Sequence, residues 1–238
     1  MHKLTPILAT SGDTGWMPVN IRHKGEMLRL WNRLVKMPDD RLTKKIFNWD
    51  ISNGYPWANE LKYLFSMNNS SFIYLNKLCC NIRELQNHMF CKHKESWAVD
   101  VWSKPKLRTY CLIKNNYDPE PYVTHNLSKS QRSFCAQLHS GTLPLALETG
   151  RFIGTPEEDR KCLVCDLGDI ENEIHFLFYC PLYDELRHFL FCKMTTICSN
   201  FFWLNDYEKL ELCFKKGPFA LATFIAQAWE KRQNSLFM

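Results

Sequence analysis

Apolar residues along most of this chain recur every three or four positions, which is the spacing of a helix and not of a strand. The clearest example joins Met27, Leu30, Trp31, Leu34 and Val35 into one apolar stripe. Such a stripe is typical of an amphipathic helix that buries one face against a core. The pattern therefore predicts a mainly α protein with a helix through this segment.

The same spacing continues through the first hundred residues. Two further short stripes and one longer stretch carry it: Leu42, Ile46 and Trp49; Leu61, Leu64 and Phe65; and about Asn81 to Trp102. We expect each stripe to face the core of a helical bundle. The acidic pair Asp39-Asp40 stands where the second helix is predicted to start.

Proline residues then interrupt the pattern, most densely in the run KNNYDPEPYVTHN that begins at Lys114. A run of this kind is typical of a linker or an irregular loop. We therefore expect two parts, a helical region over residues 1–115 and a second helical module over residues 128–238. Residues 116–127 are the predicted linker between them.

Helix boundaries in the second module are indicated by capping and proline positions. Ser128 and Gln131 form a capping box (S-x-x-Q) ahead of a helix that Gly141 is expected to end. Thr155-Pro156 predicts another helix start, because a capping hydroxyl precedes a proline at the first helical position. Pro181 suits the first position of the helix after that.

The composition is that of a soluble globular protein, with 45% hydrophobic and 23% charged residues among 238. The formal net charge of +5 permits a polyanionic partner without requiring one. No stretch approaches the roughly 18 apolar residues of a membrane span. The 11 cysteines are an odd number, and no signal peptide precedes them. We therefore expect a reduced, intracellular protein that is not secreted, in either the nucleus or the cytoplasm.

Four metal-ligand residues stand out in the second module. Cys162, Cys165, His175 and Cys180 read C-x2-C-x9-H-x4-C. Two thiolates separated by two residues grip a zinc ion from one side, and a later His and Cys can complete a tetrahedral Cys3His site. Four protein ligands leave no open position, so the predicted Zn²⁺ is structural. The competing interpretation is that these cysteines are plain thiols and His175 packs against neighbouring apolar residues.

A second group of metal-ligand residues is less specific. Cys79, Cys80, His88, Cys91 and His93 lie close together in the sequence, but no C-x2-C pair accompanies them. Free cysteines are common as small apolar fillers of a core. The sequence therefore favours buried thiols over a second metal site here.

Basic residues interleave with aromatic rings between Lys92 and Lys114, and more basic residues flank the predicted zinc ligands. Single-stranded nucleic acid favours such surfaces of cations and rings. The candidate nucleic-acid contacts are Lys104, Lys106, Arg108, Lys129, Arg132, Arg151 and Lys161. The alternative is a solvated basic face whose tryptophans point to the core. No G-x-S-x-G, phosphate-binding glycine loop or H-E-x-x-H motif is present, so we expect no catalysis.

Several segments resemble a known family. The run RSFCAQLHSGTLPLALETGRF from Arg132, the Cys162–Cys180 segment and CPLYDELR resemble the carboxy-terminal region of non-LTR (LINE-type) retrotransposon reverse transcriptases. The run from Gly12 to Asp50 and KLRTYCLIKN from Lys106 are similar to the same proteins. The resemblance thus covers nearly the whole chain.

The resemblance implies a zinc-knuckle tail that holds element RNA or target DNA with low sequence specificity. The polymerase and endonuclease domains would lie upstream, so the parent polyprotein and not this chain would be an RNA-directed DNA polymerase. One departure is His139-Ser140, which stands where such sequences often carry an arginine. Two alternatives remain: a protein-interaction module stapled by zinc, with the upstream polymerase domain as a partner, and a non-functional mobile-element remnant.

Overall fold

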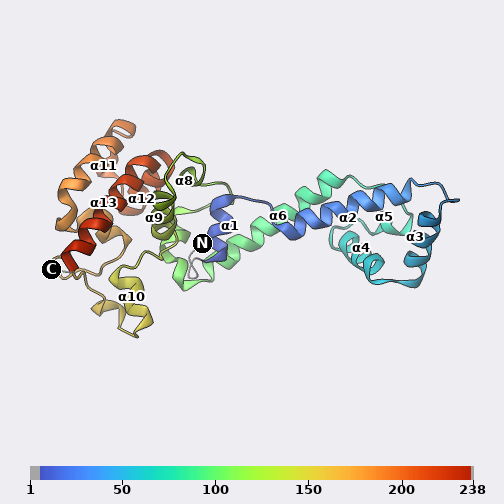
Figure 1. The fold of residues 1–238 in the computed structure, drawn as a ribbon, viewed down its shortest axis with the longest axis horizontal. Coiled ribbons are helices and arrows are strands. Elements are labelled where there is room, and N and C mark those ends of the chain that lie inside the picture. Colours follow the sequence, from blue (N-terminus) through green and yellow to red (C-terminus); the bar gives the residue numbers. More distant parts are fainter. Residues whose placement is uncertain (1–5, 237–238) are drawn as a thin grey trace. The chain divides into compact units, whose positions relative to one another are not determined.

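The computed structural model describes residues 6–236, and the chain is mainly α as predicted (Figure 1). The one extended pairing within these residues is an antiparallel bridge between Lys161 and Ile170. None of the described helices combines the length and apolar character that crossing a bilayer requires.

The chain forms two compact units, and their limits differ from the expected ones. The smaller unit runs from Met17 to Ser96, and the larger unit combines the segment up to Trp16 with everything from Trp97 onward. The expected linker over 116–127 lies inside the larger unit, where Tyr122 is 2% exposed. Pro121 begins the short helix α8 (Pro121–Thr124) there, in which Tyr122 is buried, because Pro at a first helical position sacrifices no hydrogen bond.

The smaller unit is built around one tryptophan. Its helices are α2 (Val19–Val35), α3 (Leu42–Asn53), α4 (Pro56–Met67), α5 (Ser71–Leu75) and the part of α6 (Ile82–Trp102) that precedes Trp97. Trp31 is fully buried against Phe47, Phe65 and Tyr74, with ring centroids 5.3–5.5 Å away. Its indole nitrogen donates to the Leu78 carbonyl at 2.8 Å, so this large ring is buried without an unsatisfied donor.

The predicted buried face of α3 is wrong. Leu42, Ile46 and Trp49 are 51–72% exposed, whereas Phe47 is 2% exposed and faces the core. Lys44 is buried as well, and its ammonium donates to two carbonyl oxygens at the C-terminal end of α2, at 2.8 and 2.9 Å. A cation there satisfies carbonyls that the helix itself leaves without partners, which lets the lysine displace the apolar stripe from the interior.

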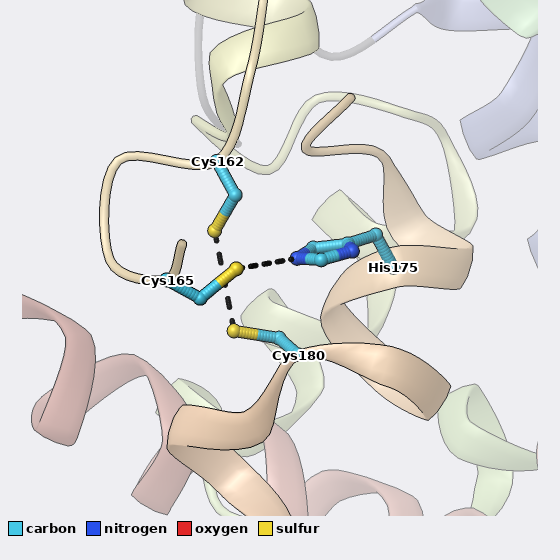
Figure 2. Close-up of side chains that lie close together, drawn as sticks. All are labelled: Cys162, Cys165, His175 and Cys180. Atoms are coloured by element: carbon cyan, nitrogen blue, oxygen red, sulfur yellow. Dashed lines mark hydrogen bonds between the residues drawn. The ribbon is translucent and has the colours of Figure 1, made fainter. Parts of the chain in front are cut away.

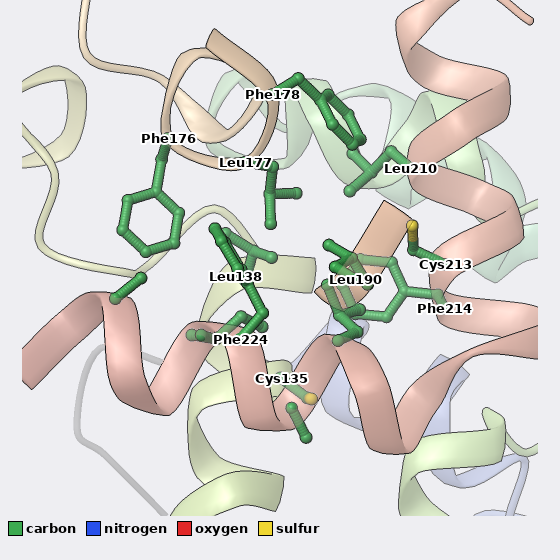
Figure 3. Close-up of a cluster of buried hydrophobic side chains, with 14 of the residues drawn as sticks. Cys135, Leu138, Phe176, Leu177, Phe178, Leu190, Leu210, Cys213, Phe214 and Phe224 are labelled. Carbon is green, nitrogen blue, oxygen red and sulfur yellow. The ribbon is translucent and has the colours of Figure 1, made fainter. Parts of the chain in front are cut away.

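The larger unit packs its helices around α13. Its α-helices are α1 (Ile7–Thr14), the part of α6 from Trp97 onward, α7 (Arg108–Ile113), α8 (Pro121–Thr124), α9 (Lys129–His139), α10 (Ala146–Phe152), α11 (Asp184–Ile197), α12 (Asp206–Lys216) and α13 (Pro218–Leu236). Shorter turns are η1 (Pro105–Leu107), η2 (Glu157–Asp159), η3 (His175–Tyr179), η4 (Pro181–Tyr183) and η5 (Phe201–Trp203). Figure 3 shows Leu138, Phe176, Leu190, Phe214 and Phe224 meeting in its core, and all five are at most 1% exposed.

Local helix signals in the larger unit are mostly confirmed. The capping box has both hydrogen bonds: the Gln131 amide donates to Ser128 Oγ, and the Ser128 amide donates to Gln131 Oε1. Gly141 follows with a φ of +65°, a conformation that favours glycine. The helix predicted at Thr155-Pro156 is wrong, since only the short turn η2 forms there and Thr155 provides no cap.

A buried polar cluster fixes α1 within the larger unit. Asp13 accepts hydrogen bonds from the hydroxyls of Tyr110 and Tyr122, and its Oδ2 lies 3.0 Å from His139 Nδ1. The side chains of Asp13 and His139 are at most 5% exposed. His139 is therefore a buried hydrogen-bonding partner of α1.

Candidate metal centre

The first two predicted ligands lie on a tight loop. The bridge between Lys161 and Ile170 closes this loop, and the Cys162 amide donates to the Asp169 carbonyl at 2.9 Å. Gly168 turns the chain with a φ of +73°. The loop thereby holds the thiols of Cys162 and Cys165 on the same side.

The other two ligands lie at the two ends of a single wide helical turn. His175 begins η3, a π-helical turn, and the Cys180 amide donates to the His175 carbonyl at 2.8 Å. This i→i+5 hydrogen bond is rare in proteins as a whole, and the π-helical turns that do occur are often at functional sites. Pro181 follows Cys180 and starts η4, as its fixed φ favours. The turn directs both side chains toward the loop over residues 161–170, called the knuckle loop below.

The four side chains converge on one point (Figure 2). Their ligand atoms all lie within 4.8 Å of one another. Cys162 Sγ is 4.0 Å from Cys180 Sγ, and Cys165 Sγ is 3.4 Å from His175 Nε2. Tetrahedral zinc with ordinary bond lengths has S···S edges of about 3.8 Å and S···N edges of about 3.6 Å. The observed separations are close to those edges, so the group could hold one metal ion.

The surroundings of the group suit a cation held by thiolates and a neutral imidazole. His175 Nδ1 is buried, has no hydrogen-bond partner among residues 6–236 and lies 3.6 Å from Asp169 Oδ2. With Nε2 on a metal, Nδ1 would carry the proton and face this carboxylate, which is the usual outer-shell arrangement of a metal-bound histidine. Arg187 donates to the Cys180 carbonyl at 2.7 Å and so holds the backbone of the last ligand in place.

The thiols of Cys162 and Cys180 shift each other's pKa in opposite directions. Contact with the Cys180 thiol and burial raise the pKa of Cys162 to about 12, whereas the same contact lowers the pKa of Cys180. Burial also raises the pKa of Cys165. Because a metal binds the thiolate, cation binding at this group must release protons and must weaken as the pH falls.

The second group of metal-ligand residues, at which the sequence favours buried thiols over a metal site, does not come together. No metal-binding arrangement within residues 6–236 includes Cys79, Cys80, His88, Cys91 or His93. Cys80 is buried, with its thiol 3.3 Å from Asn32 Oδ1, while Cys79 and Cys91 are exposed. The expected burial therefore holds for Cys80 and is wrong for Cys79 and Cys91.

Another cluster of potential ligands, Asp13, Glu120 and His139, is buried in the larger unit. The Glu120 carboxylate is already compensated, because Lys114 and Lys215 lie 2.5 and 2.6 Å from its Oε1, while Asp13 accepts hydrogen bonds from Tyr110 and Tyr122. The cluster and its contacts thus hold two ammonium groups and two carboxylates. A divalent cation there would add uncompensated charge to a buried site.

Three of the basic residues predicted to contact nucleic acid form ion pairs with buried glutamates. Lys106 and Arg151 both pair with Glu148, at 3.2 and 3.0 Å. Arg108 lies 3.3 Å from Glu173. The two glutamate side chains are at most 5% exposed, so their charges require these cations where they are.

The remaining four basic residues do not pair with buried glutamates in the described part of the chain. Arg132 donates to carbonyl oxygens of the segment before α9, at 3.1 and 3.3 Å, and so holds that segment in place. Lys104, Lys129 and Lys161 are exposed, and none forms an ion pair in the part of the chain that is described. These three lysines keep their charge available to solvent.

Two residues beside the metal-ligand group were not predicted from the sequence. Glu171 Oε1 lies 3.9 Å from Cys162 Sγ, and Glu171 is paired with Arg232 of α13. Glu171 lies in the sequence between Cys165 and His175, so its closeness to the ligands could have been expected. Its partner is 61 residues away, so no local pattern could have paired them.

Comparison with known proteins adds no relative. No protein-family model matches the chain, and no curated protein or solved structure matches it significantly. The resemblance to retrotransposon reverse transcriptases therefore stays a prediction.

Proposed function

We propose that this chain is a zinc-stabilised, non-catalytic module that binds single-stranded nucleic acid. The observation that carries the proposal is the convergence of Cys162, Cys165, His175 and Cys180 at separations close to those of a zinc tetrahedron. Zinc would supply folding free energy to a loop that has little apolar core of its own, on the order of 10 kcal/mol. Its four ligands would leave no position for substrate, so the ion would act structurally.

The nucleic-acid role is supported by the distribution of charge. Lys104, Lys129 and Lys161 are exposed and form no ion pair with another described residue, in a chain of net charge +5. Lys161 immediately precedes the first ligand, and the same loop exposes Leu163 by 70% and Leu167 by 54%. An exposed cation of this kind can bind a phosphate of the nucleic-acid backbone. We expect salt-sensitive binding of low sequence specificity.

The sequence resemblance gives this role a context. We propose that the chain corresponds to the tail of a non-LTR retrotransposon reverse transcriptase, where it would help to retain element RNA or target DNA. Catalysis would belong to the polymerase and endonuclease domains of such a polyprotein. The proposal assigns no catalytic residue to the present chain.

Docking on another protein is the second candidate function. Apolar side chains are exposed at the end of α10 as well as on the knuckle loop, with Phe152 at 56% and Ile153 at 81%. Exposed apolar residues of this kind often mark interaction surfaces. In this alternative, zinc would hold a helical platform and the lysines would be dispensable.

Fluorescence anisotropy with a single-stranded RNA of mixed sequence, titrated with salt, separates the two. The triple variant Lys104→Gln, Lys129→Gln, Lys161→Gln should bind more weakly and reduce the slope of log K against log salt by about 2. The matched control carries glutamine at Lys36, Lys45 and Lys62, which lie in or next to the helices of the smaller unit. No binding by the native chain at low salt would remove the nucleic-acid proposal.

A further inference from the structure

A cavity of about 410 Å³ lies in the smaller unit, between α2, α4 and α6. It is separate from the metal-ligand group and from the three exposed lysines. Residues from all three helices and Asn68, which follows α4, line the cavity. Among the helical residues are Lys24, Tyr63, Met67, Met89 and Lys92. A cavity of this size is large enough for a small organic ligand.

One wall of the cavity suits a flat ring. Met67 and Met89 contribute polarizable thioethers, which adapt to the faces of rings. Tyr63 adds an aromatic ring that is 64% exposed although it sits beside this apolar surface. An exposed ring next to an apolar wall is the arrangement on which a nucleobase stacks.

A buried acceptor lies among the lining residues. The Asn68 amide nitrogen donates to the Leu64 carbonyl at 2.7 Å, which fixes the orientation of the amide. Its Oδ1 is buried and has no hydrogen-bond partner within the described residues. A buried carbonyl oxygen without a donor is destabilising, and a ligand N–H would satisfy it once the Asn68 side chain turns toward the cavity, because Oδ1 is closed to solvent in its present position.

Cations complete the lining. Lys24 and Lys92 are both present, and Lys92 Nζ donates to the Met67 carbonyl at 2.7 Å, which holds its ammonium at the cavity. Glu60 and His93 also line the cavity, so acid does not outweigh base there. The lining therefore combines a ring platform, a hydrogen-bond acceptor and positive charge.

We infer that this cavity binds one nucleotide of a single-stranded nucleic acid. The base lies against Tyr63 and the two methionines, one of its N–H groups donates to Asn68 Oδ1, and the adjacent phosphate binds Lys24 and Lys92. This inference rests on the proposed function and extends it, because it makes part of the affinity depend on bases and not only on phosphates.

The test compares two DNA strands of equal length and charge, one with ordinary bases and one abasic throughout. Anisotropy titrations use the full chain and the variants Tyr63→Ala, Asn68→Ala and Lys24→Gln. Phe72→Ala is the matched aromatic control, since Phe72 is 57% exposed in the same unit and does not line the cavity. Circular dichroism and thermal unfolding verify that every variant is folded.

The native chain should bind the intact strand about tenfold more tightly than the abasic strand. Tyr63→Ala should abolish this preference, Phe72→Ala should preserve it, and Lys24→Gln should weaken both strands. Equal affinity for the two strands, or a preference that survives Tyr63→Ala, overturns the nucleotide pocket and leaves the proposed function standing. Failure to bind these strands and the single-stranded RNA at low salt overturns the proposed function itself.

Discussion

Arg232 of α13 and Glu171 beside the knuckle loop form a buried, bidentate ion pair. Arg232 Nε donates to Oε1 at 2.8 Å, and Nη2 donates to Oε2 at 2.7 Å. Glu171 also accepts from the Ala146 amide at 2.7 Å and lies 3.9 Å from Cys162 Sγ. One carboxylate thus connects the last helix, the start of α10 and the candidate metal centre.

Replacing Arg232 with methionine should destabilise the chain by about 3–5 kcal/mol, because Glu171 would remain buried without its counter-charge. Urea unfolding of the metal-loaded protein measures this loss. Lys231→Met is the matched control, since Lys231 lies 3.8 Å from Glu185, whose side chain is 91% exposed, and should change stability by less than about 0.5 kcal/mol. Similar small losses in both variants would contradict a stabilising role for the buried pair.

Lys104 and Lys106 should separate nucleic-acid binding from folding. Lys106→Gln removes one of two cations from buried Glu148, so it should cost about 1–2 kcal/mol of stability and leave RNA affinity nearly unchanged. Lys104→Gln should leave stability unchanged and lower the salt slope of binding by about 0.7. Thermal unfolding and salt titrations on the same samples provide both readouts. The reverse pattern would show that ion pairing does not decide which lysine is available.

Asp13→Ala should release α1 from the larger unit. Three buried partners, Tyr110, Tyr122 and His139, would lose their shared acceptor, and unsatisfied buried polar groups cost about 1–3 kcal/mol each. Hydrogen exchange should then increase across Ile7–Thr14. Asp39→Ala, at an exposed position, serves as control. Unchanged exchange in the Asp13 variant would contradict the anchoring role.

Buried thiols should make the chain sensitive to alkaline pH. Burial raises the pKa of Cys213 to about 12, above its ordinary value of about 8.5. The folded chain therefore keeps a proton that the unfolded chain releases, so this stabilisation is complete below about pH 8.5 and is lost as the pH rises toward about 12.

The corresponding variant is Cys213→Ala. Its free energy of unfolding should fall less steeply between about pH 9 and 11 than that of the native chain, by up to about 1.4 kcal/mol per pH unit. Chemical unfolding at several pH values measures the slope. Cys91→Ala, at an exposed cysteine, should keep the native slope.

The parts of this molecule that sequence reasoning identified are those encoded locally. Helical spacing indicated the fold class, and the Ser128–Gln131 capping box lies within four residues. The four candidate ligands also lie close together in the sequence. Their residue types and spacing predicted that Cys162 and Cys180 meet at one point.

The errors arose where distant contacts decide. The exposed stripe of Leu42, Ile46 and Trp49 has helical spacing, but carbonyls at the end of α2 bind Lys44 and turn a different face inward. Lys106 belongs to a basic run in the sequence, and only the fold brings it to Glu148. Neither partner can be inferred from periodicity or composition.

Elemental analysis of the purified chain tests the central claim most directly. Inductively coupled plasma mass spectrometry should find one zinc ion per chain in the native protein and in Cys91→Ser, and none in Cys180→Ser. A strong chelator should remove the ion and lower the melting temperature of the native protein. A native chain that purifies folded and metal-free, with a melting temperature that a chelator leaves unchanged, would contradict the account.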